Sequence, residues 1–199
     1  EQLYREYVNE TYTTPFDSAA VWEIADTLLA ENGITNLDLE ESTRALRPNT
    51  WESPFVNPAG EVVPRHTVVL SVIDYLRENY TYTLEPEVPT EEVLDAAGNP
   101  VLDENGEPIT QSAIVSENNL DAFLTEVKEG YCVHFATAAV GILREMGFAV
   151  RYDEGYIASR WNRTYAADAV ARYRTSVRDY DAHAWIEVYY PCIGWVQYE

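Results

Sequence analysis

The chain has 199 residues, 46% of them hydrophobic, and its 34 acidic and 13 basic residues give a formal net charge of −21 at pH 7. This length can bury a sizeable core, whereas the acidic balance disfavours nonspecific binding to nucleic acid or adhesion to an anionic membrane. No apolar run approaches the roughly 20 residues of a membrane-spanning helix. We therefore expect a soluble unit with no nucleic-acid partner, whose attachment to a membrane would need segments absent from this chain.

Two helices are predicted in the first 80 residues. Residues 17–31 carry apolar side chains at helical spacing and end near Asn32-Gly33, and residues 67–80 show the same spacing. A Pro- and acid-rich loop at 36–65 separates them, and residues 80–84 form a short extended piece.

The stretch from 85 to 116 is the least regular part of the sequence. An acidic turn occurs twice in it, as Asp95-Ala-Ala-Gly98-Asn-Pro and as Asp103-Glu-Asn-Gly106-Glu-Pro, which predicts a hairpin-like excursion. The structural interpretation of this stretch is a surface insertion, and the functional interpretation is a lid or specificity loop. A short helix over about 118–128 then leads to Cys132.

Cys132 opens an apolar helical run that is predicted over 132–146, with Gly147 as its stop. A thiol in the first helical turn meets the positive end of the helix dipole and unpaired backbone N–H groups, which favour the thiolate and can stabilise an oxyanion. Cys132 is therefore a candidate nucleophile, and its backbone N–H is a candidate oxyanion donor. The structural alternative is a small buried hydrophobe.

Three strands are predicted after this helix. The first covers about 148–157 and is bulged or turned at Gly155; residues 183–190 and 195–199 form a hairpin around the turn at 191–194. His183 and Glu199 then lie at corresponding ends of the hairpin, within a residue or two of register, so the carboxylate can orient the imidazole. A core histidine and a solvated terminal carboxylate are the alternatives for these two residues.

The remaining histidines and Cys192 are assigned structural or surface roles. His134 lies two residues from Cys132, on nearly the opposite helix face at about 100° per residue, and His66 suits a surface or capping position. Cys132 and His134 lack a second pair with zinc-ligand spacing, so we predict no metal and no cofactor. Cys192 in the turn lies roughly 20 Å from the His183 end of its strand, too far for a disulfide with Cys132.

Six arginines precede His183 in one segment. They suit either a substrate that bears carboxylates or simple local charge balance. These residues are Arg151, Arg160, Arg163, Arg172, Arg174 and Arg178.

The motifs around these candidates carry a family resemblance. Gly130-Tyr-Cys-Val-His-Phe-Ala, Asp181-Ala-His-Ala-Trp-Ile-Glu and Gly194-Trp-Val-Gln-Tyr-Glu resemble, in order and spacing, the bacterial transglutaminase-like core over roughly residues 67–199. The chain departs from that family in having Glu199 where aspartate is more usual, Cys192 where a turn glycine is usual, and no continuation after residue 199.

This resemblance implies an α+β fold of the papain-like type, with the nucleophile at a helix N-terminus packed on an antiparallel sheet. Residues 67–199 would form the catalytic core, with an insertion at about 85–116, and residues 1–66 a preceding helical and loop extension. Cys132 would be the nucleophile, His183 the base and Glu199 the third member of the triad.

The implied activity is acyl transfer on an amide bond through a thioester, resolved by an amine in transamidation or by water in deamidation or hydrolysis. A cysteine peptidase acting on peptide bonds is one alternative, and a noncatalytic binding or scaffold module is another. The expected partner is a protein or peptide, cell-wall-associated material included. Similar bacterial proteins place this domain outside the cytoplasm, so we expect the ectodomain of a membrane-anchored protein.

Overall fold

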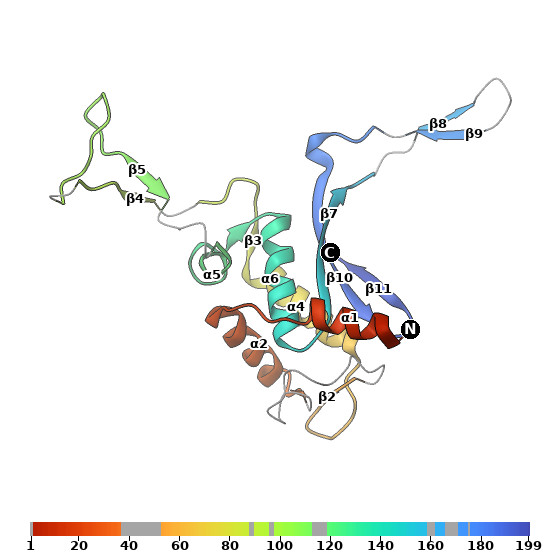
Figure 1. Ribbon diagram of the computed structural model, residues 1–199. Helices are drawn as coiled ribbons and strands as arrows, with labels where there is room; N and C mark the ends of the chain where they lie inside the picture. Colours follow the sequence, from red (N-terminus) through yellow and green to blue (C-terminus); the bar gives the residue numbers. More distant parts are fainter. Residues whose placement is uncertain are drawn as a thin grey trace.

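The computed structural model describes residues 2–36, 53–87, 90–95, 98–112, 119–158, 162–165, 171–174 and 176–199. Helices and antiparallel strands are mixed along the chain, and the α+β class predicted from the sequence is confirmed (Figure 1). The helical elements are α1 (Gln2–Tyr12), α2 (Ala19–Glu31), α4 (Arg65–Asn79), α5 (Asn119–Ala122), the π-turn η2 (Phe123–Val127), α6 (Cys132–Glu145) and the 3₁₀ turn η3 (Asp179–Asp181). The strands are β1 (Thr35–Asn36), β2 (Phe55–Val56), β3 (Thr81–Tyr82), β4 (Thr90–Glu92), β5 (Thr110–Ser112), β6 (Glu129–Gly130), β7 (Val150–Tyr156), β8 (Asn162–Tyr165), β9 (Ala171–Arg174), β10 (Ala182–Tyr190) and β11 (Gly194–Tyr198).

The main sheet has the antiparallel order β11-β10-β7, with β10 in the centre. Alternation along β10 gives the sheet two chemically different faces. Ala184, Ile186 and Val188 are buried in the core that contains α6, whereas His183 and Trp185 alternate with them on the other face. The predicted hairpin is therefore present.

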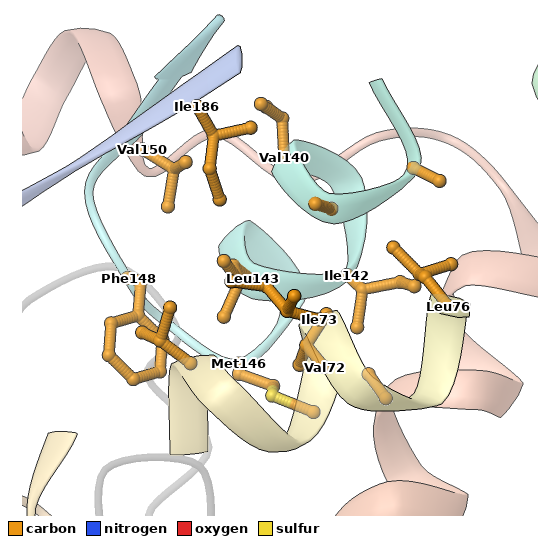
Figure 2. Packing of buried hydrophobic residues seen from close by; sticks show 14 of the residues in the cluster. Val72, Ile73, Leu76, Val140, Ile142, Leu143, Met146, Phe148, Val150 and Ile186 are labelled. Atoms are coloured by element: carbon orange, nitrogen blue, oxygen red, sulfur yellow. The ribbon is translucent and has the colours of Figure 1, made fainter. Parts of the chain in front are cut away.

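Helix α6 lies at the centre of the hydrophobic core. Its residues Ile142 and Leu143 are fully buried, between α4 on one side and the sheet residues Val150 and Ile186 on the other (Figure 2). Val21 of α2 belongs to the same core, so the N-terminal segment packs together with the C-terminal part of the chain.

The ends of α6 follow from local backbone chemistry. Tyr131 before it is extended, and Gly147 after it has φ +86°, a left-handed conformation that glycine adopts without strain and that commonly ends a helix. The helix predicted over 132–146 is thus observed over Cys132–Glu145.

Helix α1 was not predicted from the sequence. Its tyrosines lie against the outer face of the hairpin, where Tyr4 contacts Tyr189 and Tyr12 contacts Trp195 at ring-centroid distances of 6.1 and 5.0 Å. Edge-on aromatic contacts of this kind hold a helix that has no continuous aliphatic stripe.

Gly155 forms no bulge, and that prediction was wrong. The β7–β10 ladder continues through it, with Glu154 opposite Ala184, Gly155 opposite His183 and Tyr156 opposite Ala182. The reason for a glycine is space: a Cβ at position 155 would lie 2.7 Å from Cη2 of Trp185.

Two excursions leave the body of the molecule (Figure 1). One contains β4 and β5, which pair antiparallel, followed by the isolated bridges Leu94–Pro100 and Leu102–Pro108. It has the hairpin-like form expected from the repeated acidic turn. The other is the antiparallel pair β8 and β9. Within the described ranges, no helix is both long and apolar enough to cross a membrane.

Candidate active site

Cys132 is the first residue of α6, and its position is set by the short pair of strands before it. β6 pairs in parallel with β3, and the Thr83 N–H donates to the Gly130 carbonyl at 2.7 Å. The chain then enters the helix at Cys132, so the Cys132 N–H is one of the donors that have no acceptor within the helix. The thiol is half-buried and free.

Cys132, His183 and Glu199 line one cavity of about 380 Å³. The structure thus brings the three predicted site residues to the same place, although they come from α6, β10 and the residue after β11. Arg77 also borders the cavity, and its apolar lining comes from α4, α6 and β10, through Ile73, Leu76, Phe135, Ala136, Ala139 and Ile186. Within the described part of the chain, no hydrogen bond joins Cys132 to His183.

His183 and Glu199 pair across the hairpin. Ile186 lies opposite Tyr198, so the same register places the next residue, Glu199, opposite Trp185. His183 lies two residues before Trp185 on the same face of the sheet, and Glu199 therefore approaches it diagonally. The distance from His183 Nε2 to Glu199 Oε1 is 3.9 Å, which allows an ion pair when the imidazole is protonated. The His183 ring also stacks on Trp185, with centroids 6.4 Å apart.

Helix α4 holds the end of β11 next to His183. Arg77 Nη2 donates to the main-chain oxygen of Glu199 at 2.6 Å, and His66 Nδ1 lies 2.7 Å from the hydroxyl of Tyr198. His66 is exposed, as its predicted surface position requires, but its contact with the residue before Glu199 was not predicted. Sequence reasoning has no signal for it, because the two residues are 132 positions apart.

Two tyrosines near Cys132 were missed by the sequence analysis. Burial and the charge of ionised Cys132 raise the pKa of Tyr82, as does a hydrogen bond to the thiolate, while the Cys132 backbone N–H opposes the shift. Burial, a hydrogen bond to Glu154 and the charges of Glu154 and Cys132 raise the pKa of Tyr152. The Tyr152 hydroxyl donates to Glu154 Oε1 at 2.5 Å. Alternation along β7 puts Tyr152 on the face of Val150, a signal that could have found it.

His134 closes the start of α6, in agreement with its predicted structural role. The Tyr131 backbone N–H donates to His134 Nδ1 at 3.3 Å, and the ring packs against Phe123 with centroids 5.5 Å apart. Burial lowers the pKa of His134. The imidazole is therefore engaged with the backbone and aromatic neighbours of the helix start.

Of the six arginines before His183, Arg151 and Arg178 have described side chains. Arg151 donates to Glu187 and pairs with Asp153 at 2.9 Å, and its guanidinium lies 4.5 Å from the Trp195 ring centroid. Arg178 contacts Tyr180. Both are engaged locally, which supports charge balance for these two; the other four side chains lie outside the described part of the structure.

Cys192 is exposed in the hairpin turn and free, like Cys132. Its φ is +68°, the left-handed conformation that glycine tolerates best. The backbone at this turn therefore suits glycine, the residue that the family resemblance led us to expect here. Among the described residues, no cluster of three or more His, Cys, Asp or Glu side chains is arranged to hold a metal ion.

Comparison with curated proteins gives two partial matches. The chain is 36% identical over 83 residues to the Bacillus subtilis (strain 168) protein YebA, covering 42% of this chain and 11% of that protein. It is 33% identical over 79 residues to a protein-glutamine gamma-glutamyltransferase of Pseudomonas aeruginosa, covering 40% of this chain and 11% of that enzyme. The aligned region therefore spans about a tenth of each relative.

Among solved structures, the periplasmic domain of TgpA from Pseudomonas aeruginosa is similar in fold. Its ethylmercury-bound form superposes with a TM-score of 0.53 at 17% identity, covering 98% of this chain and 48% of that one; a second structure of the same domain gives 0.52. Residues 101–199 also match the family model of the transglutaminase-like superfamily. Fold, motifs and family match agree, and the chain belongs, through these residues, to the transglutaminase-like superfamily.

Proposed function

We propose that the protein catalyses acyl transfer on amide bonds, with Cys132 as nucleophile, His183 as general base and acid, and Glu199 as the group that orients His183. The observation that carries this proposal is the shared cavity, where the start of α6 meets the His183–Glu199 pair. Similarity to a protein-glutamine gamma-glutamyltransferase supports the same reaction class.

In the proposed reaction, the Cys132 thiolate attacks the amide carbon while His183 holds the proton taken from the thiol. The carbonyl π electrons move to oxygen, which receives a hydrogen bond from the Cys132 N–H. When the C–N bond breaks, His183 gives its proton to the departing amine and a thioester remains. The missing His183–Cys132 hydrogen bond is compatible with this scheme, because catalytic contacts often tighten only with substrate bound.

The thioester is resolved by an acceptor. Attack by an amine, whose proton passes to His183, gives transamidation and regenerates the thiol, whereas attack by water gives deamidation or hydrolysis. The protein-glutamine transferase among the relatives favours glutamine side chains of a protein or peptide as acyl donor. A cysteine peptidase acting on peptide bonds is the neighbouring alternative.

We place the protein outside the cytoplasm, as the ectodomain of a membrane-anchored bacterial protein, with cell-wall-associated proteins or peptides among its substrates. The support is the fold shared with a periplasmic domain. Labelling of an epitope-tagged full-length protein with an impermeant thiol reagent tests this placement. Protection of the exposed Cys192 until the cytoplasmic membrane is opened would contradict it.

The first test is alkylation by iodoacetamide across pH, with digestion to locate the adduct. At about pH 6 we expect Cys132 to react at least about tenfold faster than the exposed Cys192, because an imidazole pair and a helix start favour the thiolate. His183→Ala and Glu199→Gln should slow Cys132 and leave Cys192, the internal control, unchanged.

Amine incorporation and peptide cleavage are then compared on the same variants. Consumption of glutamine side chains with ammonia release supports the acyltransferase, and cleavage of the backbone supports the peptidase. If Cys132 is labelled slowly, and at the same rate in His183→Ala, Glu199→Gln and wild type, the result would instead support the noncatalytic binding module.

A further inference from the structure

The triad leaves the developing oxyanion with one identified donor, the Cys132 backbone N–H. Oxyanion sites usually present two donors, so a second one should lie within reach of both Cys132 Sγ and that N–H. Two tyrosine hydroxyls, from Tyr82 and Tyr152, lie near Cys132.

The backbone fixes Tyr82 beside the start of α6. Tyr82 lies opposite Gly130 in the β3–β6 pair, which is closed by hydrogen bonds from the Thr81 N–H to Lys128 O at 2.8 Å and from the Thr83 N–H to Gly130 O at 2.7 Å. Its ring packs against the ring of Phe135, with the two ring centroids 5.8 Å apart. Tyr82 also lines the cavity that contains Cys132, and 57% of it is exposed, so a substrate can reach its hydroxyl.

Tyr82 and Cys132 line the same cavity, and Gly130, the partner of Tyr82 in the β3–β6 pair, lies two residues before Cys132. In agreement with this placement, burial and the charge of ionised Cys132 raise the pKa of Tyr82, and the Cys132 backbone N–H lowers it. A carbonyl oxygen attacked by Sγ and held by that N–H would occupy the same region. The Tyr82 hydroxyl is therefore a candidate donor to the place where negative charge develops.

Tyr152 is the weaker candidate because its proton is already used. It donates to Glu154 at 2.5 Å, and a hydroxyl bonded to a carboxylate gives up a strong hydrogen bond if it turns to another acceptor. Tyr82 lines the cavity that contains Cys132, whereas Tyr152 is not among its lining residues.

We propose that Tyr82 is a catalytic residue, the second oxyanion donor beside the Cys132 backbone N–H. As the C–S bond forms and the carbonyl electron pair moves to oxygen, the Tyr82 O–H donates to that oxygen, and Tyr82 keeps its proton throughout. This inference rests on the proposed acyl transfer.

The test compares Tyr82→Phe with two other tyrosine variants. Tyr180→Phe is the matched control, because Tyr180 is exposed and lies outside the cavity, and Tyr152→Phe tests the rival donor. With a glutaminyl peptide and a small amine, Tyr82→Phe should lower kcat by about 10²-fold or more, the usual effect of removing one oxyanion donor, with little change in KM. Both other variants should stay within about threefold of wild type.

A second readout separates catalysis from reactivity of the thiol. Alkylation by iodoacetamide forms no oxyanion, so its limiting rate at high pH should be the same in Tyr82→Phe and wild type. A peptide aldehyde that forms a hemithioacetal with Cys132 does create one, and its affinity should fall at least about tenfold in Tyr82→Phe.

Each result decides the assignment. Unchanged kcat and aldehyde affinity in Tyr82→Phe, or a loss that appears in Tyr152→Phe instead, would overturn it; so would an equal fall in the limiting alkylation rate, which indicates a structural role. If wild type turns over no faster than Cys132→Ala, the proposed function fails, and aldehyde affinity alone then decides on Tyr82.

Discussion

At the scale of single residues, Gly155 has a role that its sequence context does not reveal. It lies opposite His183 in the sheet, and the Trp185 ring fills the space that a side chain at 155 would need. Because His183 stacks on Trp185, the absence of a Cβ at 155 supports the position of the candidate base. A glycine in a strand thus marks close packing here, where the sequence suggested a bulge.

We predict that Gly155→Ala destabilises the protein by about 1–3 kcal/mol, the usual cost of adding a methyl group to a packed site, and slows Cys132 alkylation at about pH 6. The new Cβ would lie 2.7 Å from Trp185 and displace the indole together with His183. Urea unfolding and the alkylation rate measure the two effects.

The double variant Gly155→Ala, Trp185→Leu identifies the cause. Residues that share one contact show coupled free energies, so the alanine should cost less once the indole is gone. Strictly additive costs would mean that the Trp185 contact is not the source of the effect.

At the scale of elements, the sequence predicts the helices and hairpins whose residues form a local pattern. Apolar periodicity and Gly147 locate α6, and the turn before Trp195 sets the register that brings Glu199 to His183. Contacts between distant segments are not encoded this way. The Tyr82–Cys132 proximity depends on the β3–β6 pair, whose strands are separated by the whole 85–116 stretch, and α1 is held by aromatic rings without an aliphatic repeat.

The start of α6 should make stability depend on pH through His134. Burial lowers the pKa of His134, so the unfolded chain binds a proton at a higher pH than the folded protein does. The neutral His134 imidazole contributes its full share of stability at pH values above its pKa in the unfolded chain, which is about 6.5. This contribution is lost as the pH falls through the lower pKa that His134 has in the folded protein.

Urea unfolding of wild type and His134→Asn at about pH 7.5 and pH 5.5 tests this dependence. Asparagine keeps an acceptor for the Tyr131 N–H and cannot titrate in this range, so the variant should lose less stability on acidification. Other titrating groups are the same in both proteins and cancel in the comparison. Equal losses would show that His134 titrates alike in the folded and unfolded chains.

At the scale of the whole molecule, the candidate site forms where separate parts of the chain meet. α4 supplies Arg77 and one cavity wall, α6 supplies Cys132, and the hairpin supplies His183 and Glu199. The chain as a whole has a formal net charge of −21, and a field of one sign raises the local concentration of cations and lowers that of anions. The charge should therefore influence which small molecules reach Cys132, independently of turnover.

We predict that alkylation of Cys132 depends on both the charge of the reagent and the salt concentration. At low salt, anionic iodoacetate should react more slowly than neutral iodoacetamide after correction for their intrinsic rates with a free thiol, and cationic 2-bromoethylamine should react faster. Raising the ionic strength to about 1 M shortens the screening length to roughly 3 Å. The reaction with iodoacetate should then become faster, the reaction with bromoethylamine slower, and the reaction with iodoacetamide should keep its rate.

Faster reaction of iodoacetate at low salt would show that Arg77, at the cavity, outweighs the acidic surface, and Arg77→Met would then reverse the order. With the predicted order, the acidic surface would concentrate amines, which are cations in solution and must lose a proton before they can attack the proposed thioester.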